Sequence, residues 1–154
     1  LQGRALRLKV IRASKEQLYS DGVHLFLEVK DPQDFSKKER MVMRFFDRQC
    51  KEVFGEIVEE LYPVFQKYGV AVPSLRIRSM DTRWGSCLPG KGVITLNKRL
   101  LEAPRNCIEY VVMHELCHFI HPNHSKHFYA FLSMLMPDWK ERKKVLDAND
   151  TYYL

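Results

Sequence analysis

The sequence lacks any apolar run that approaches the ~20 residues needed to cross a membrane, and it carries no recognisable secretory signal. It also lacks internal repeats and low-complexity segments. Cysteine is scarce, and none of the four cysteines stands in a C-x-x-C pair, so nothing favours a particular disulfide pattern. We therefore expect a cytoplasmic protein with free thiols and no membrane partner.

The chain does contain enough apolar material for one folded domain. Of its 154 residues, 45% are hydrophobic and 12% aromatic, which is typical of a globular protein with its own core. The net charge is +6, and basic residues gather near both ends: Arg4, Arg7, Lys9, Arg12 and Lys15, then Lys140, Arg142, Lys143 and Lys144. Such a surface attracts nucleic acid or acidic partners. A half-exposed strand explains the first group more simply, because Leu6, Leu8 and Val10 alternate with basic residues.

Hydrophobic periodicity predicts a series of strands and helices. Strands are expected at 4–12, 23–29, 75–78 and 93–96, and helices at 104–121, 124–136 and 139–146. A further long helix should open at Ser36 through a capping box with Glu39, be interrupted at Pro63 and end at Gly69. The order strand, helix, strand, helix, with the helices gathered on a small sheet, predicts the α+β class.

Residues 114 to 118 read His-Glu-Leu-Cys-His and match the pattern H-E-x-x-H. In a helix, His114 and His118 lie ~6 Å apart along the axis and ~40° around it, so both imidazoles can reach one ion. Glu115 lies ~100° round from His114, beside the ion, where it could hold a water as general base. Three neutral nitrogen ligands with one open position are typical of a catalytic zinc site, so a third ligand is required.

Three histidines compete for the place of the third ligand. His124 follows a chain reversal at Pro122-Asn123 that would bring it back toward the first pair. His121 lies on the same helical face, but its Cα would be ~10 Å along the axis from that of His114, too far to share one tetrahedral ion. We therefore prefer His124, with His121 as its rival and His127 as a weaker candidate still.

Several blocks of sequence occur together and in order: Thr82-Arg83-Trp84-Gly85-Ser86-Cys87, Ile94-Thr95-Leu96-Asn97, Tyr110 to His118, and Asn123-His124-Ser125 with Phe128. In this combination the chain resembles the YgjP-like metallopeptidase family, small zincins related to the SprT-like and WLM groups. The resemblance is strong over residues 75–146 and weak over the N-terminal strands. It implies a minimal zincin domain of the α+β class, a small mixed β-sheet packed with helices. It also implies zinc on His114, His118 and His124, with Glu115 as general base.

The resemblance extends to the residues around the metal. In zincins an extended peptide commonly binds an edge strand by β-addition, and the matching strand here consists of Val93, Ile94, Thr95 and Leu96. Trp84 and Asn97 belong to the family motif, and we expect them to shape the site. Cys87 could approach the metal. The candidates for a second oxyanion donor are Arg83, His127 and Tyr129.

Two features depart from the pattern of related proteins. Metzincins share the ligand spacing but have Gly where this chain has His121, and no clear Met-turn follows. The chain also opens at Leu1-Gln2-Gly3-Arg4 without Met, whereas family members usually carry a further N-terminal stretch. We therefore expect residues 1–154 to form a single zincin-like metallopeptidase domain that lacks an N-terminal segment of the full-length protein.

The sequence thus predicts a zinc metalloendopeptidase that hydrolyses peptide bonds in proteins or peptides. Glu115 would take a proton from water and pass it to the leaving amine. The alternative is a nucleic-acid-associated, zinc-stabilised module, or a protease recruited to DNA-bound proteins, and the basic N-terminus is the argument for it. Three histidines bind several divalent ions, so the pattern alone leaves zinc and other metals open.

Overall fold

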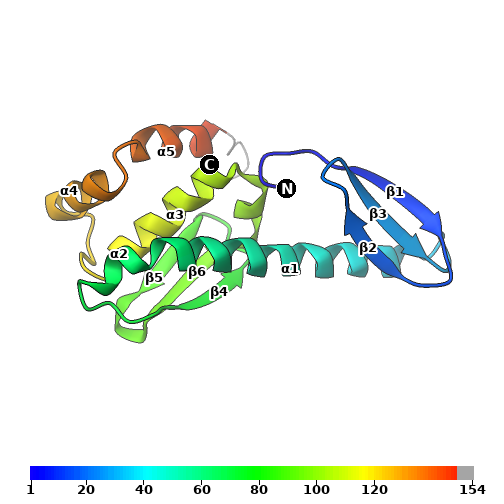
Figure 1. Ribbon diagram of the computed structural model, residues 1–154, viewed down its shortest axis with the longest axis horizontal. Helices are drawn as coiled ribbons and strands as arrows, with labels where there is room; N and C mark the ends of the chain where they lie inside the picture. Colours follow the sequence, from blue (N-terminus) through cyan, green and yellow to red (C-terminus); the bar gives the residue numbers. More distant parts are fainter. Residues whose placement is uncertain (149–154) are drawn as a thin grey trace.

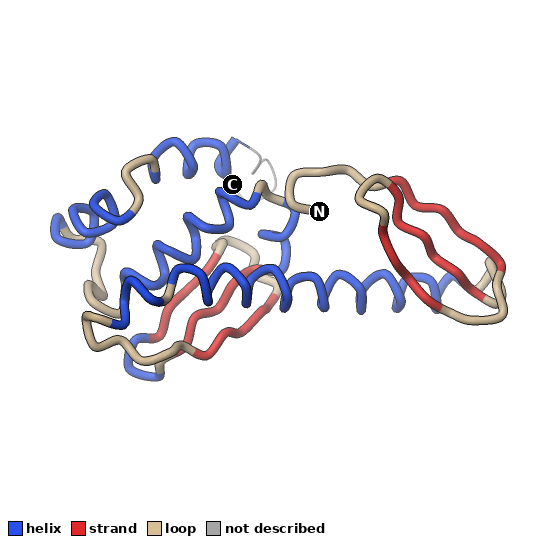
Figure 2. Tube along the Cα trace, in the orientation of Figure 1, coloured by secondary structure: helices blue, strands red, loops and turns tan. Residues whose placement is uncertain are grey.

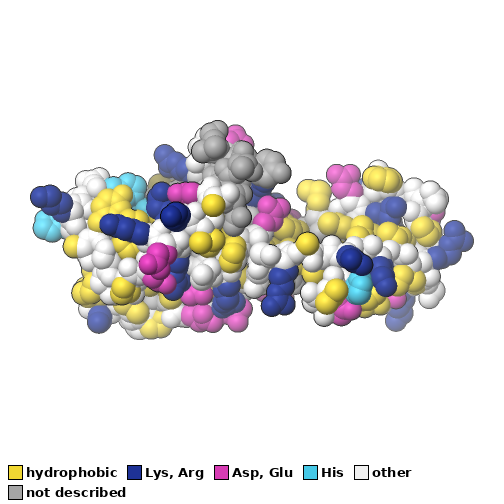
Figure 3. All heavy atoms as spheres, turned by 90° about the horizontal axis from the view of Figure 1, so that it is seen from above, with side chains coloured by type: hydrophobic (Ala, Val, Ile, Leu, Met, Phe, Trp, Pro, Cys, Tyr) yellow, Lys and Arg dark blue, Asp and Glu magenta, His cyan; other side chains and the backbone are white. Residues whose placement is uncertain are grey.

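The computed structural model describes residues 1–148, which fold into two three-stranded sheets and a set of helices. In chain order the elements are β1 (Arg7–Arg12), β2 (Gln17–Ser20), β3 (His24–Val29), α1 (Phe35–Leu61), α2 (Pro63–Gln66), β4 (Ser74–Arg78), β5 (Gly85–Leu88), η1 (Pro89–Lys91), β6 (Val93–Asn97), η2 (Lys98–Glu102), α3 (Arg105–Cys117), α4 (Lys126–Leu135) and α5 (Trp139–Ala148). Figures 1 and 2 show an elongated molecule with the first sheet at one end and the second sheet at the other. Seen from above, a narrower waist separates two lobes (Figure 3). The predicted α+β class is confirmed.

The first sheet has the order β1-β3-β2, with β1 parallel and β2 antiparallel to the central strand β3. Strands β1 and β3 were predicted, although β1 begins only at Arg7. β2 was not predicted, because it is short and only Leu18 is even partly buried, so no apolar alternation marks it. Leu27 and Val29 of β3 are buried, whereas every residue of the edge strand β1 is exposed.

The second sheet has the order β4-β6-β5, so β6 is its central strand. β6 runs parallel to β4 and antiparallel to β5, with Ile94 opposite Leu75 on one side and Cys87 on the other. The prediction that Val93, Ile94, Thr95 and Leu96 form a substrate-binding edge is therefore wrong, because both sides of this strand are already paired. Their mostly apolar run is that of a buried central strand. The edge strand that sequence reasoning missed is β5, whose Trp84-Gly85-Ser86 start reads as a turn.

The 27-residue helix α1 connects the two ends of the molecule (Figure 1). Its N-cap is Asp34, whose Oδ1 accepts a hydrogen bond from Lys37 N at 3.1 Å, so the N-cap lies two residues before Ser36, the N-cap of the predicted capping box. As predicted, Pro63 interrupts the helix and becomes the first residue of α2, and the chain turns at Gly69 with φ 80°. No helix within residues 1–148 combines the length and the apolar character needed to cross a membrane.

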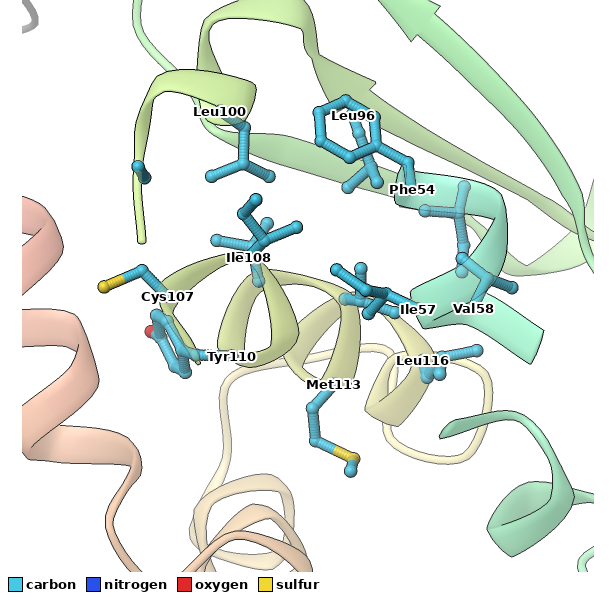
Figure 4. Packing of buried hydrophobic residues seen from close by; sticks show 14 of the residues in the cluster. Phe54, Ile57, Val58, Leu96, Leu100, Cys107, Ile108, Tyr110, Met113 and Leu116 are labelled. Carbon is cyan, nitrogen blue, oxygen red and sulfur yellow. The ribbon is translucent and has the colours of Figure 1, made fainter. Parts of the chain in front are cut away.

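The main hydrophobic core surrounds α3. Figure 4 shows its centre, where Phe54 and Ile57 of α1 and Leu96 of β6 lie around Ile108 and Leu116 of α3. All five side chains are fully buried. α3 also contacts β5 on one side and α4 and α5 on another. Because the interior is closely packed, these contacts fix the position and rotation of α3, and with it the direction of the H-E-x-x-H side chains.

Candidate metal centre

Helix α3 carries His114 and ends earlier than predicted, at Cys117 instead of residue 121, one residue before His118. At this end the backbone tightens, and His118 N donates to the carbonyl oxygen of Glu115 at 3.2 Å. Such bonds between residues three apart replace the α-helical pattern ahead of Pro122, which cannot continue a helix. His118 is therefore the C-cap of α3, and the chain reverses directly after it.

The reversal brings three histidines together. The ring nitrogens through which His114, His118 and His124 could bind a metal all lie within 4.8 Å of one another. A tetrahedral site with Zn–N distances of ~2.1 Å places nitrogens roughly 3.4 Å apart, so modest side-chain rotations would close the group around an ion. His124 stands directly before Ser125, the N-cap of α4, whose Oγ accepts from Phe128 N at 3.3 Å. Within residues 1–148, no other trio of His, Cys, Asp or Glu side chains is grouped in this way.

Phe128 is the wall against which the three imidazoles pack. It is fully buried, and its ring centroid lies 5.0 Å from that of His114, 4.6 Å from that of His118 and 5.1 Å from that of His124. The sequence motif contains Phe128, but this role was not predicted. An aromatic residue on an amphipathic helix is most often a core residue, and only the packing of α4 on α3 places it behind the histidines.

Hydrogen bonds decide which ring nitrogen is available to a metal. His118 Nδ1 lies 3.2 Å from the carbonyl oxygen of His121. Because a carbonyl oxygen only accepts, Nδ1 carries the proton and Nε2 keeps its lone pair. His114 Nδ1 lies 3.4 Å from Glu115 Oε2. Desolvation, followed by the nearby His114 and His118, lowers the pKa of His124, which keeps its imidazole in the neutral, metal-binding form to lower pH.

The other candidate ligands, His121 and Cys87, lie outside the group formed by His114, His118 and His124. The His121 ring packs edge-on against Phe131 at 5.5 Å and beside His127 at 6.3 Å, so His121 contributes its carbonyl oxygen, not its ring, to the site. Cys87 lines the neighbouring cavity but is not among the grouped donors. Burial, with Glu115 nearby, raises the pKa of the Cys87 thiol to about 12. The thiol is therefore protonated at neutral pH, which disfavours metal binding.

The three histidines open onto a cavity of about 450 Å³ lined by α3, the edge strand β5 and α5, which we call the candidate catalytic cavity. Glu115 lies in its wall and is only 5% exposed. Gly85 of β5 passes so close that a Cβ there would lie 3.2 Å from Glu115 Oε2 and 3.1 Å from Val111 Cγ1. The absence of a side chain at residue 85 therefore lets a strand edge run beside the carboxylate.

Asn97 anchors the loop that leads into β5. It is fully buried, and its Nδ2 donates to the carbonyl oxygens of Met80 and Arg83, both at 2.9 Å. Its backbone N donates to the carbonyl oxygen of Trp84 at 2.9 Å, and the Trp84 side chain packs against the main core. Asn97 therefore holds the start of β5 in place, and the expectation that Trp84 and Asn97 shape the site stays a prediction.

The three candidates for a second oxyanion donor occupy different places. Arg83 lines the cavity beside the histidines. Tyr129 stacks on His124 at a centroid distance of 6.1 Å and lines an adjoining cavity. His127 packs beside His121 and lines neither of these cavities. Arg83 is therefore the donor best placed to contact a substrate in the candidate catalytic cavity.

The donor set fits a zinc ion. Three imidazoles converge, no fourth protein donor joins them within residues 1–148, and a carboxylate lies in the same cavity. Structural zinc sites are normally closed by four protein ligands, whereas catalytic sites keep one position for water or substrate. The arrangement is therefore suited to metal-assisted hydrolysis.

Comparison with known proteins supports this interpretation of the site. The sequence profile of the family described as YgjP-like, metallopeptidase domain, matches residues 1–149. No curated protein matches the chain in sequence. Among solved structures, the chain is similar to the metallopeptidase zymogen jannalysin of Methanocaldococcus jannaschii, at 20% identity and a TM-score of 0.52, over 62% of this chain and 95% of the other.

Two further structures are similar in fold. The metallopeptidase zymogen abylysin of Pyrococcus abyssi matches at 22% identity and a TM-score of 0.51, over 64% of this chain and 92% of the other. A mutant of Wss1 from Saccharomyces cerevisiae matches at 14% identity and a TM-score of 0.52, over 94% of this chain and 97% of the other. At these low identities the likeness concerns the fold, whereas the profile spans nearly the whole chain. This protein belongs to the YgjP-like metallopeptidase family, as its sequence motifs indicated, and is accordingly a metal-dependent peptidase.

Proposed function

We propose that this metallopeptidase is a zinc endopeptidase in which His114, His118 and His124 hold the metal and Glu115 is the general base. The observation that carries the proposal is the grouping of three histidine nitrogens within 4.8 Å, with a buried carboxylate in the same cavity. The extent of the family profile, residues 1–149, supports the further proposal that residues 1–154 act as a single catalytic domain.

The residues of the chain have separate tasks in this mechanism. When bound, zinc would supply a Lewis acid that lowers the pKa of water toward ~7 and polarises a carbonyl group. Glu115 would accept a proton from the attacking water and deliver it to the leaving amine nitrogen. Phe128 and the carbonyl oxygen of His121 would hold the imidazoles in their binding orientation.

An extended peptide would bind along β5. Of the two edge strands in the second sheet, β5 contacts α3 and lines the cavity, whereas β4 contacts α1. Among the described residues no strand pairs with the outer side of β5, so its backbone groups are available to a substrate strand. A strand edge binds the middle of a polypeptide as readily as its end, which supports endopeptidase action on proteins or peptides.

A nucleic-acid-associated module remains the second candidate. Arg7, Lys9 and Arg12 are exposed on β1, but this strand lies at the opposite end of the molecule from α4, which begins just after His124 (Figure 1). Glu115 favours catalysis, because a purely structural metal site has no use for a base in its cavity. Affinity for DNA that falls steeply with salt, in a protein without proteolytic activity, would favour the module.

Metal content and peptide cleavage together test the proposed function. Elemental analysis of the wild type should find about one zinc ion per chain. His124→Ala should lose it, whereas the matched variant His121→Ala should keep it, because His121 acts through its backbone carbonyl. Glu115→Gln should keep the metal and lower kcat on an unfolded protein substrate by about 10²–10⁴-fold.

Two results would overturn this assignment. One is a well-folded protein that takes up no metal when zinc is supplied. The other is Glu115→Gln with full activity, which would leave the metal site in place but remove Glu115 as the base.

A further inference from the structure

A second cavity, of about 720 Å³, opens beside His114 between α3, α4 and α5. We call it the α5 cavity. It shares Tyr110, His114, Lys143 and Asp147 with the wall of the candidate catalytic cavity, so the two are adjacent. A peptide lying across the histidines would place one of its side chains, next to the scissile bond, at the mouth of the α5 cavity.

Stacked aromatic rings form one wall of the α5 cavity. Trp139 stacks on Tyr110 at a centroid distance of 6.2 Å and on Tyr129 at 5.5 Å. Its Nε1 donates to Ser133 Oγ at 2.9 Å, and only 8% of the residue is exposed. Tyr129 in turn stacks on His124. The wall is therefore held rigidly and is continuous with the metal site, which suits the apolar part of a substrate side chain.

The rim of the α5 cavity is basic. Lys140, Lys143 and Lys144 are spaced at i, i+3 and i+4 and so lie on one face of α5, with Asp147 one turn further. Lys143 Nζ binds Asp147 at 2.8 Å, and Lys140 Nζ lies 5.7 Å from the centre of the Trp139 ring. Lys144 forms no ion pair with a described residue. The described lining of the α5 cavity thus contains three ammonium groups and one carboxylate, that of Asp147.

Charged and apolar side chains also lie next to each other on the molecular surface. Figure 3 shows Lys and Arg side chains beside hydrophobic ones on the face of the molecule that carries α4 and α5. A site with an aromatic wall and a cationic rim complements a side chain that has a short apolar stem and an anionic end. Among the amino acids, only glutamate and aspartate meet this description.

We propose that the α5 cavity is a substrate subsite that selects an acidic side chain beside the scissile bond. The inference rests on the proposed peptidase function and deepens it by naming the class of substrate. The stem of the glutamate or aspartate would lie against Trp139 and Tyr129, and its carboxylate would bind Lys144 and Lys140. Lys143 keeps its partner Asp147 and marks the boundary with the candidate catalytic cavity.

Cleavage of matched peptides is the first arm of the test. Zinc-loaded wild type is given peptides that differ only by Glu or Gln, scanned through the positions on either side of the scissile bond. At one position kcat/KM should be about fivefold higher for Glu, the size expected of solvent-exposed ion pairs, and the preference should shrink at high salt. Equal cleavage of the Glu and Gln peptides at every position would overturn the inference and leave the proposed function standing.

Substitution of the rim identifies the cause of the preference. Lys144→Gln should reduce the preference for Glu, and Lys144→Glu should turn it toward a Lys-bearing peptide. Lys51→Gln is the matched control, because Lys51 is exposed on α1 and does not line the α5 cavity. A Glu preference that survives both Lys144 substitutions unchanged would overturn the role of the rim.

Peptide binding without turnover separates the inference from the proposed function. Zinc-loaded Glu115→Gln is titrated with fluorescently labelled Glu and Gln peptides, and the dissociation constants are measured by anisotropy. If no peptide is cleaved by the wild type but the Glu peptide binds about fivefold more tightly and this binding depends on Lys144, the proposed function fails and the α5 cavity stands as a binding site for an acidic side chain. If the two peptides bind equally, the subsite fails whether or not cleavage occurs.

Discussion

The position of the Glu115 carboxylate depends on Gly85, a residue that has no side chain. Gly85 has no positive φ, so its backbone conformation would accept other residues. What requires glycine is space: a Cβ would lie 3.2 Å from Glu115 Oε2 and 3.1 Å from Val111 Cγ1. Glu115 is buried beneath β5 and has little room to move away. Gly85, within the Trp84-Gly85-Ser86 motif, therefore acts on the position of the Glu115 carboxylate through steric contact.

Gly85→Ala tests this contact. The methyl group should displace the Glu115 carboxylate by a few tenths of an ångström and lower kcat about tenfold, because a shift near 1 Å costs up to ~10²-fold. Zinc content should stay unchanged, since none of the three atoms nearest to the new methyl group belongs to a histidine.

The matched control for this substitution is Gly55→Ala. Gly55 lies in the middle of α1, and a Cβ there meets nothing within 4 Å. That variant should keep full activity and gain about 0.5–1 kcal/mol of unfolding free energy through helix propensity. Full activity in Gly85→Ala would show that the carboxylate tolerates the displacement.

At the scale of elements, the decisive fact is the place of each strand in the second sheet. β6 is bonded on both sides, by β4 and β5, and its residues Val93 to Asn97 are largely buried. β5 is partly exposed and contacts α3. A substrate strand can be added only at an edge, and the edge beside the histidines belongs to β5.

Amide chemical shifts measured during peptide titration distinguish the two strands. With zinc-loaded Glu115→Gln, an uncleaved peptide should shift the backbone amides of residues 85–88 most strongly. Residues 93–96 should respond less, because their amides keep their partners within the sheet. The larger response along residues 93–96, or none along 85–88, would rule out strand addition at β5.

At the scale of the whole molecule, the two ends differ in how many apolar residues they bury. The main core consists of residues from α1, the second sheet and the helices that follow, whereas buried Leu27 and Val29 of the first sheet lie outside this cluster. The first sheet is connected to the rest along α1, and Gln2 N and Gly3 N donate to the carbonyl oxygens of Leu101 and Glu102. With few buried apolar contacts, the first sheet should open more readily than the body that holds the metal site.

Native-state hydrogen exchange measures this difference. Amides of β1, β2 and β3 should exchange through an opening whose free energy is on the order of 2 kcal/mol below that of α3 and β6. Zinc should slow the exchange of α3 further and leave β1 to β3 nearly unchanged, because a ligand stabilises only the states that bind it. Equal protection in both sheets would mean that they unfold as one cooperative unit.

The sequence by itself determined the features that depend on near neighbours in the chain. H-E-x-x-H places His114, Glu115 and His118 by helix geometry alone, and Pro122 with Asn123 predicts the reversal toward His124. Pro63 likewise interrupts α1 because a proline lacks the N–H of a helical residue. The α+β class and the family followed from the same patterns together with the ordered motif blocks.

Only the tertiary structure decided the features that depend on segments distant in the chain. Strand pairing made β6 central and β5 the edge, although the resemblance to zincins led us to expect residues 93–96 at the edge and the start of β5 reads as a turn. Packing of α4 and α5 on α3 placed Phe128 behind the histidines and created the α5 cavity beside His114. The physical reason is the same in each case: periodicity shows which residues are buried, but which partner buries them is set by the energy of the assembled core.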